Sequence, residues 1–181
     1  MDKQKLTAKE LLERYSKGER DFEHIDLSNE DLADAKLDGI KLRFANLEFT
    51  NLAGARLKNA DLSFATLDHA DLENADLSYT NLNGASFIRA NLKHANLSHA
   101  NADADFKSAS LIGANLSDAD LSFASFNHAD LMNANIRNAN LYITYFIDAD
   151  LTNADFRGTN LKGEDLYSEE FEDAEISGVK F

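Results

Sequence analysis

The sequence predicts an all-β solenoid of about eight four-sided coils, closed at its start by a short α-helix. A large apolar residue returns every five residues from Phe22 to Phe181, with a single one-residue slip. Residues that tolerate unusual backbone conformations recur 20 positions apart. Residues 1–19 do not repeat and carry a helix-start signature. We therefore expect a capping helix within residues 1–19 and a repeat domain over residues 20–181.

The first segment, "LTAKELLERY", contains the pattern of a capping box. Thr7 is the expected N-cap, Glu10 follows three residues later, and Leu6 and Leu11 can form a hydrophobic staple. The exposed end of a solenoid invites pairing with other chains, so a cap is expected there. The side chains expected to cover the first coil are Leu11, Leu12 and Tyr15.

The five-residue period fits neither a 3.6-residue helix nor the alternation of a strand. The 33 central positions hold 22 Leu, 8 Phe, 2 Ile and one Ala, and the position two residues earlier holds 22 Ala and 4 Thr. A chain that turns a corner after each short extended segment, with two inward residues per unit, accounts for both restrictions. Four such corners close one coil, and four five-residue units give a coil of about 20 residues, a period found in solenoids.

Residues two positions after each centre should share a corner when their numbers differ by 20. Two corners hold residues that tolerate positive φ, as a type II turn requires: Asp34, Gly54, Asn74 and His94 on one, and Gly39, Asn59, Tyr79 and His99 on the next. A third corner instead holds Phe44, Phe64, Phe123 and Ile143. For this third corner we expect a different turn geometry.

Stacked coils should lie about 4.8 Å apart, which gives the repeat domain a length of roughly 38 Å. Ala114 is expected to point inward in a narrow interior. At 102–106, "ADADF", the register slips by one residue, either as a simple corner deletion or as a kink that shapes a binding surface. One column of stacked phenylalanines is expected: Phe87, Phe106, Phe126 and Phe146.

The segment "NADLSFATLDHADLENADLSYTNL" resembles the pentapeptide-repeat family, whose consensus is A-(D/N)-L-x-x. The resemblance covers residues 20–181. It implies a right-handed quadrilateral β-helix. Some members of the family dimerise through the C-terminal end, so both a monomer and a C-terminal-end homodimer remain open.

Composition argues against an enzyme. The chain has no Cys, which excludes thiolate catalysis and Cys-ligated metals. All five His occupy corner positions, and no two are stacked one coil apart, so no histidine cluster is available for a metal. Serines occur without the partners of a catalytic triad, and a filled rod offers no cleft. We predict no catalytic, cofactor-binding or metal-ligating residue, and no cofactor.

The formal net charge of −14 disfavours direct binding to nucleic acid or to an anionic membrane. No apolar run reaches the length of a membrane span, and the charged start lacks a signal-peptide core. A cytoplasmic location is therefore expected. The acidity itself has two interpretations: a surface that opposes aggregation, or a mimic of DNA.

The stretch "LYITYFIDADL" at 141–151 departs from the polar pattern of the repeat. Leu141, Thr144 and Phe146 take the inward positions, which leaves its other apolar side chains outward or along a corner. Contiguous exposed apolar surface, rich in Tyr, marks a contact site; ordinary aromatic filling of a permissive turn is the alternative. We call the following residues the contact patch: Phe123, Tyr142, Ile143, Tyr145, Ile147 and Tyr167.

Two functions follow from these observations. The leading hypothesis is a non-enzymatic rod that presents a face to an unidentified protein partner. The alternative rests on the resemblance: some family members imitate DNA, bind DNA gyrase or topoisomerase IV, and modulate supercoiling or quinolone sensitivity. The N-terminal helix and the lack of a loop inserted between coils depart from that group.

Overall fold

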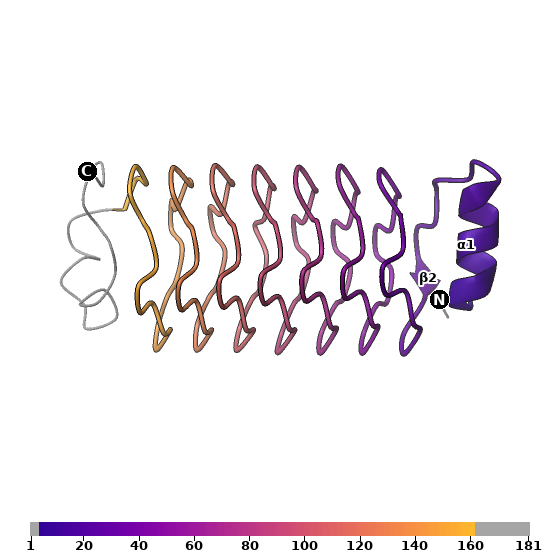
Figure 1. Ribbon diagram of the computed structural model, residues 1–181, viewed down its shortest axis with the longest axis horizontal. Helices are drawn as coiled ribbons and strands as arrows, with labels where there is room; N and C mark the ends of the chain where they lie inside the picture. Colours follow the sequence, from indigo (N-terminus) through magenta and orange to yellow (C-terminus); the bar gives the residue numbers. More distant parts are fainter. Residues whose placement is uncertain (1–3, 162–181) are drawn as a thin grey trace.

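The computed structural model describes residues 4–161 as one rod with a helix across one end (Figure 1). The regular elements are strand β1 (Gln4–Lys5), helix α1 (Ala8–Ser16) and strand β2 (Ile25–Asp26). From Asp21 onward the chain winds into coils held together by isolated parallel bridges rather than by long strands. Within the described residues the architecture is thus a stack of four-sided coils.

The bridges set the register of the coils. Asp21 pairs with Lys41, and Asp130 pairs with Asp150, so the residue numbers of each pair differ by 20. The coil that begins at Asn101 is one residue shorter than the others. Following the partners along the rod gives the first residue of each of seven coils: Asp21, Lys41, Asp61, Asn81, Asn101, Asp120 and Asn140. The predicted coil length is confirmed.

Apart from the shortened corner at 102–104, the corners are β-turns built in the same way. Ala35 N–H donates to the Leu32 carbonyl at 3.1 Å and closes the turn, while Leu32 N–H donates to Asn51 in the next coil at 2.7 Å. The residue between them, Asp34, has φ 55°. The backbone therefore satisfies its own polar groups both around and along the rod.

The expectation of a different geometry at the third corner is wrong. Phe44, Phe64, Phe123 and Ile143 have φ of 58°, 59°, 65° and 55°, as at the other corners. Inter-coil bonds explain this uniformity, because Phe44 N–H donates to the Ser63 carbonyl at 3.0 Å, and corner residues from His24 to Asn138 make the equivalent bond to the next coil. The rings of Phe44 and Phe64 also stack at 5.0 Å, which offsets part of the strain of positive φ.

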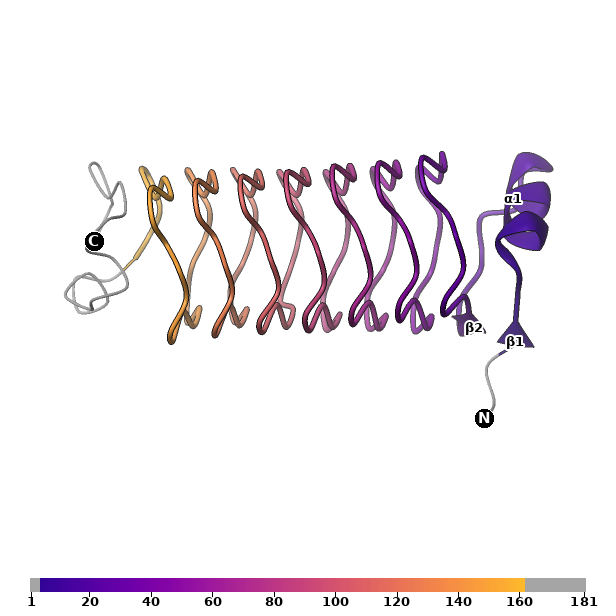
Figure 2. The same cartoon turned by 60° about the horizontal axis from the view of Figure 1, so that its bottom comes forward.

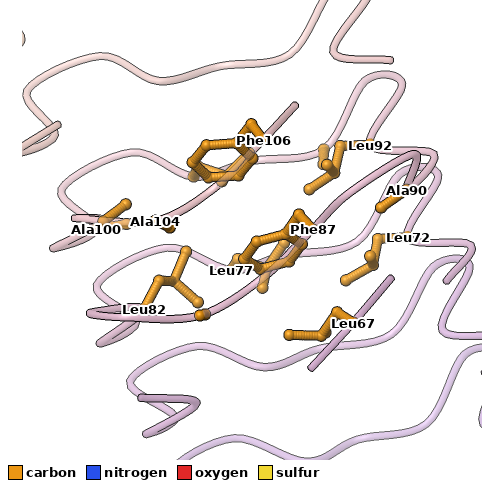
Figure 3. Packing of buried hydrophobic residues seen from close by; sticks show 14 of the residues in the cluster. Leu67, Leu72, Leu77, Leu82, Phe87, Ala90, Leu92, Ala100, Ala104 and Phe106 are labelled. Carbon is orange, nitrogen blue, oxygen red and sulfur yellow. The ribbon is translucent and has the colours of Figure 1, made fainter. Parts of the chain in front are cut away.

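The interior consists of columns of like side chains. Figure 3 shows Phe106 lying over Phe87 and Leu92 over Leu72. The predicted phenylalanine column is confirmed: ring centroids are 4.9 Å apart for Phe87 and Phe106, 4.8 Å for Phe106 and Phe126, and 5.4 Å for Phe126 and Phe146. Ala114 is fully buried, as expected for its inward position.

The N-terminal segment caps the first coil through both its helix and a strand. The capping box is confirmed, because Glu10 N–H donates to Thr7 Oγ1 at 3.3 Å and Thr7 N–H donates to Glu10 Oε2 at 2.9 Å. Leu11 is fully buried, but Leu12 is exposed, so the prediction that Leu12 covers the coil is wrong. Sequence reasoning also missed β1, which pairs in parallel with β2.

The register slip is a corner deletion. Ser86 pairs with Asp105, whose number is higher by 19, whereas Asp105 pairs with Ser125, whose number is again higher by 20. Ala102 and Ala104 on either side of the shortened corner both stay buried. Figure 2 shows the coils continuing along the same axis past this point, so the slip removes a side-chain position without bending the rod.

Candidate protein-contact surface

The contact patch lies on the side of the rod that contains the phenylalanine column. On this face the outward residues Asp105, Ser125 and Tyr145 follow one another through bridges. The third corner borders the face on one side with Phe123 and Ile143. Ile147 precedes the fourth corner, which carries His128 and Asp148, on the other side. The described residues of the patch therefore come from two neighbouring coils and span the width of one face.

Five of the six patch residues are exposed, as the sequence predicted. Their exposed fractions run from 43% to 56%, for Phe123, Tyr142, Ile143, Tyr145 and Ile147. Tyr167 lies outside the described residues. The stretch at 141–151 is thus surface rather than additional core.

The backbone beneath the patch is firmly bonded. Phe123 N–H donates to the Tyr142 carbonyl at 2.9 Å, and Phe126 N–H donates to the Tyr145 carbonyl at 2.8 Å. The rings of Phe123 and Tyr142 meet edge to face, with centroids 5.6 Å apart and planes at 88°. Thr144 Oγ1 donates to the Leu121 carbonyl at 2.9 Å and anchors the turn from inside. A partner would therefore meet a preorganised surface.

Among the described residues, Ile143 is the one β-branched residue at a positive φ. Its φ of 55° is a genuine outlier for a β-branched side chain. Most corners carry Gly, Asn, Asp or His at this position, which adopt such a conformation at lower cost. A costly residue that is also 43% exposed is not explained by core packing.

The surface also bears exposed rings away from the patch. Phe49 and Tyr79 are 55% and 51% exposed, and each stacks on a histidine one coil later, at 4.8 Å for His69 and 4.6 Å for His99. Sequence reasoning did not single them out as contact candidates, although their corner positions were readable. They form isolated pairs on different corners, whereas the contact patch is contiguous.

A notch adjoins the patch where the corner residue is missing. It has a volume of about 280 Å³ and is bounded by Gly84 and Ala85, by residues 103–105, and by Phe123 and Ser125. Sequence reasoning identified the slip but not the notch. The signal was present, because Gly84 falls directly beneath the deleted position and has no side chain to fill it.

On one outward row of the rod, in which each residue bridges to the equivalent residue of the next coil, amide side chains separate the first carboxylates. Asn51 Nδ2 donates to Asp31 Oδ1 at 2.9 Å, and Asn91 Nδ2 donates to Asp71 Oδ1 at 2.9 Å on the same row. On the fourth corner, His128 Nδ1 lies 3.4 Å from Asp148. Over residues 31–91 this row therefore alternates carboxylate with neutral amide, whereas farther along it Asp130 and Asp150 are direct neighbours.

The described residues offer little for metal or membrane chemistry. Across residues 4–161, no three His, Asp or Glu side chains gather where they could hold a metal ion. No helix in this same range combines the length and apolar character needed to cross a bilayer. All five His have positive φ at corners, which places them where the sequence predicted.

Comparison with known proteins gives one consistent family. The model described as pentapeptide repeats matches eight copies, over residues 40–78, 70–103, 102–138 and 133–163. No curated protein matches the sequence significantly.

Three solved structures illustrate the similarity. HetL, a pentapeptide repeat protein involved in heterocyst differentiation regulation in the cyanobacterium Nostoc sp. strain PCC 7120, is 29% identical, with 96% of each chain covered and a TM-score of 0.31. The pentapeptide repeat protein alr5209 from Nostoc PCC 7120 is 40% identical over 58% of this chain and 84% of its own, with a TM-score of 0.42. QnrB1, a plasmid-mediated fluoroquinolone resistance protein, is 16% identical over 90% of this chain and 91% of its own, with a TM-score of 0.47.

Proposed function

Because this chain belongs to the pentapeptide repeat family, we propose that it is a non-enzymatic rod that binds a protein partner through the contact patch. The observation that carries the proposal is Ile143, which is exposed although its β-branched side chain stands at φ 55°. Strain of this kind persists at functional sites and is disfavoured elsewhere. A solubility-driven surface would favour Asn or Gly at this corner.

The composition of the patch supports a protein partner in particular. Tyr142 and Tyr145 combine large apolar rings with a hydroxyl, a combination enriched at protein interfaces. The patch contains no charged side chain among its described members. Its bonded backbone lowers the entropy that a partner must remove on binding. The rod thus holds the patch residues in place, and the patch residues make the contacts with the partner.

The test replaces Ile143 with Asp and compares the proteins captured from the native cell extract by cross-linking. A photoreactive amino acid at position 147 would record neighbours of the patch directly. We expect the Ile143→Asp variant to fold and to lose the proteins that the unmodified patch captures. The matched control is Phe49→Asp, because Phe49 is also an exposed corner aromatic at positive φ but lies outside the patch. Equal capture by Ile143→Asp and the parent chain would refute the proposal.

Several finer statements belong to the same proposal. We take the coils to be right-handed, as the family resemblance implies, and the repeat domain to extend over residues 20–181 after a cap within residues 1–19. We place the protein in the cytoplasm, as a monomer or as a homodimer joined at its C-terminal end. Small-angle scattering on the full chain distinguishes the two assemblies by their maximum dimension.

The alternative function, binding to DNA gyrase or topoisomerase IV, rests on the net charge of −14. The arrangement of that charge weakens the case for DNA mimicry, because the neutral Asn51 separates Asp31 from Asp71 on their row. A gyrase supercoiling assay, with and without a quinolone, decides the matter. Inhibition or drug protection by micromolar protein would favour DNA mimicry; the contact-patch proposal expects neither effect.

A further inference from the structure

The third corner lacks two successive side chains in an otherwise bulky column. Phe64 precedes Gly84, the next coil has lost its corner residue, and Phe123 and Ile143 follow. The notch occupies this gap. Phe64 and Phe123, which flank the gap along the rod, are 51% and 53% exposed. The opening therefore stands where two corner side chains are missing, between two exposed aromatic residues.

The size of the notch limits what can enter it. At about 280 Å³ it lies just below the range of roughly 300–1,000 Å³ typical of small-molecule sites. It is also open on the outer side of the corner, where Asp103 is exposed. One side chain of another protein fits such a gap better than an enclosed ligand does.

The charge of the notch selects the kind of side chain. The Asp103 carboxylate has no hydrogen-bond or ion-pair partner within residues 4–161, whereas its backbone N–H donates to Asn83 Oδ1 and its carbonyl accepts from Gly84 N–H in the preceding coil. Asp105 Oδ1 accepts the Lys107 N–H at 2.9 Å, which leaves its second oxygen for another donor. Two carboxylates beside the ring of Phe123 favour a cation that can also stack on an aromatic ring.

We propose that the notch receives an arginine side chain of the protein that binds the contact patch. A guanidinium is planar, bonds carboxylates through a fork of donors and stacks on rings, whereas an ammonium is compact and more strongly hydrated. Phe123 belongs to both the notch and the patch, so one partner segment reaches both. This inference rests on the proposed function and adds its chemical selectivity: an apolar segment that carries an arginine.

The experiment follows amide shifts of the isotope-labelled full chain during titration with a blocked leucine-arginine-leucine tripeptide. The matched probe replaces arginine with citrulline, which keeps the shape and removes the charge. We expect saturable shifts at Gly84, Asp103 and Asp105, with arginine bound about threefold to fivefold more tightly than citrulline. Replacing arginine with lysine should weaken binding, because the fork and the stacking are lost.

Variants distinguish binding of arginine in the notch from binding of the partner to the contact patch. Asp103→Asn should reduce the preference for arginine over citrulline, because only the Asp105 carboxylate then remains in the notch. Asp118→Asn, which alters another exposed carboxylate on a different corner of the rod, should leave that preference unchanged. Equal binding of the two peptides, an unchanged preference in Asp103→Asn, or no saturable shift at these residues would overturn the notch assignment. Loss of partner capture in Ile143→Asp alongside any of those results would leave the proposed function standing and remove only the arginine site.

Discussion

The ring of Phe64 lies so close to Gly84 in the next coil that a Cβ added there would stand 2.5 Å from Phe64 Cδ1. Gly39 has nearly the same φ, 70° against 69°, yet an added Cβ would meet nothing within 4 Å. The two glycines therefore separate backbone strain from a side-chain clash. Both the floor of the notch and the packing of its neighbouring ring depend on the absence of a side chain at Gly84.

Gly84→Ala should destabilise the protein more than Gly39→Ala. Gly39→Ala is expected to lower the free energy of unfolding by about 1 kcal/mol, because alanine resists positive φ. Gly84→Ala should cost about 1 kcal/mol more, since the Phe64 ring must move away. Urea unfolding followed by circular dichroism measures both. Adding Phe64→Ala should erase the difference in stability between the two glycine variants. Equal effects of the two glycine variants would show that the Phe64 ring moves aside without cost.

Ile143→Asn should raise the free energy of unfolding by about 1 kcal/mol, because Asn adopts positive φ more readily than a β-branched residue. Phe123→Asn should gain less, since it also loses the edge-to-face contact with Tyr142. Thermal and urea unfolding of both variants provide the measurement. A less stable Ile143→Asn variant would mean that the side chain contributes packing, and the argument from strain would fail.

Ala114→Leu should lower the free energy of unfolding by about 1–3 kcal/mol, because the buried position lies in a filled interior. The same exchange at Ala33, which is exposed on the first coil, should change stability by less than about 0.5 kcal/mol. Parallel denaturant titrations compare the two. Similar values for both would contradict the inward assignment of Ala114.

Acid should loosen the N-terminal cap before the coils. The backbone and side-chain donors of Thr7 hold the pKa of Glu10 below its ordinary value of 4.5, and the Arg14 guanidinium does the same for the pKa of Glu19. Carboxyls with a lowered folded pKa stabilise the fold above their unfolded pKa, and this contribution is lost as pH falls through the folded pKa. The loss therefore occurs below pH 4.5.

Cα chemical shifts of α1 between about pH 6 and about pH 3 test this expectation. The helix should lose order below pH 4.5 while the shifts of the coil interior stay constant. Glu10→Gln should begin with a less ordered helix and respond less to acid, because one titrating group is gone. Parallel changes in helix and coils would instead indicate a single cooperative loss of structure.

The repeating interior could be predicted from the sequence because many repeats carry the same information about which positions point inward. Each inward position recurs dozens of times, so the coil length, the burial of Ala114 and the column from Phe87 to Phe146 all followed from spacing. Inward and outward positions in each five-residue unit also settled that Tyr142 and Ile147 are exposed. Whether a partner uses them is a separate question, which spacing does not address.

The errors arose where local preference competed with stacking. Phenylalanine disfavours positive φ, so Phe44 suggested a different turn, yet the inter-coil bonds and the ring of Phe64 impose the common one. Leu12 was assigned to the cap because it is apolar, but the rotation of α1 leaves it exposed. The pairing of Gln4–Lys5 with β2 involves two polar residues, for which no periodic signal exists.

The shortened corner at Asp103 also bears on how such a gene can change length. A codon lost from a corner leaves the alanines on both sides buried and the next coil in phase, whereas a codon lost between two inward residues would rotate every later side chain out of place. Only the corners, therefore, can absorb a deletion of one codon. Over many generations, single-codon losses should accumulate at corners, and each would leave behind a hollow on the surface that selection could then put to use.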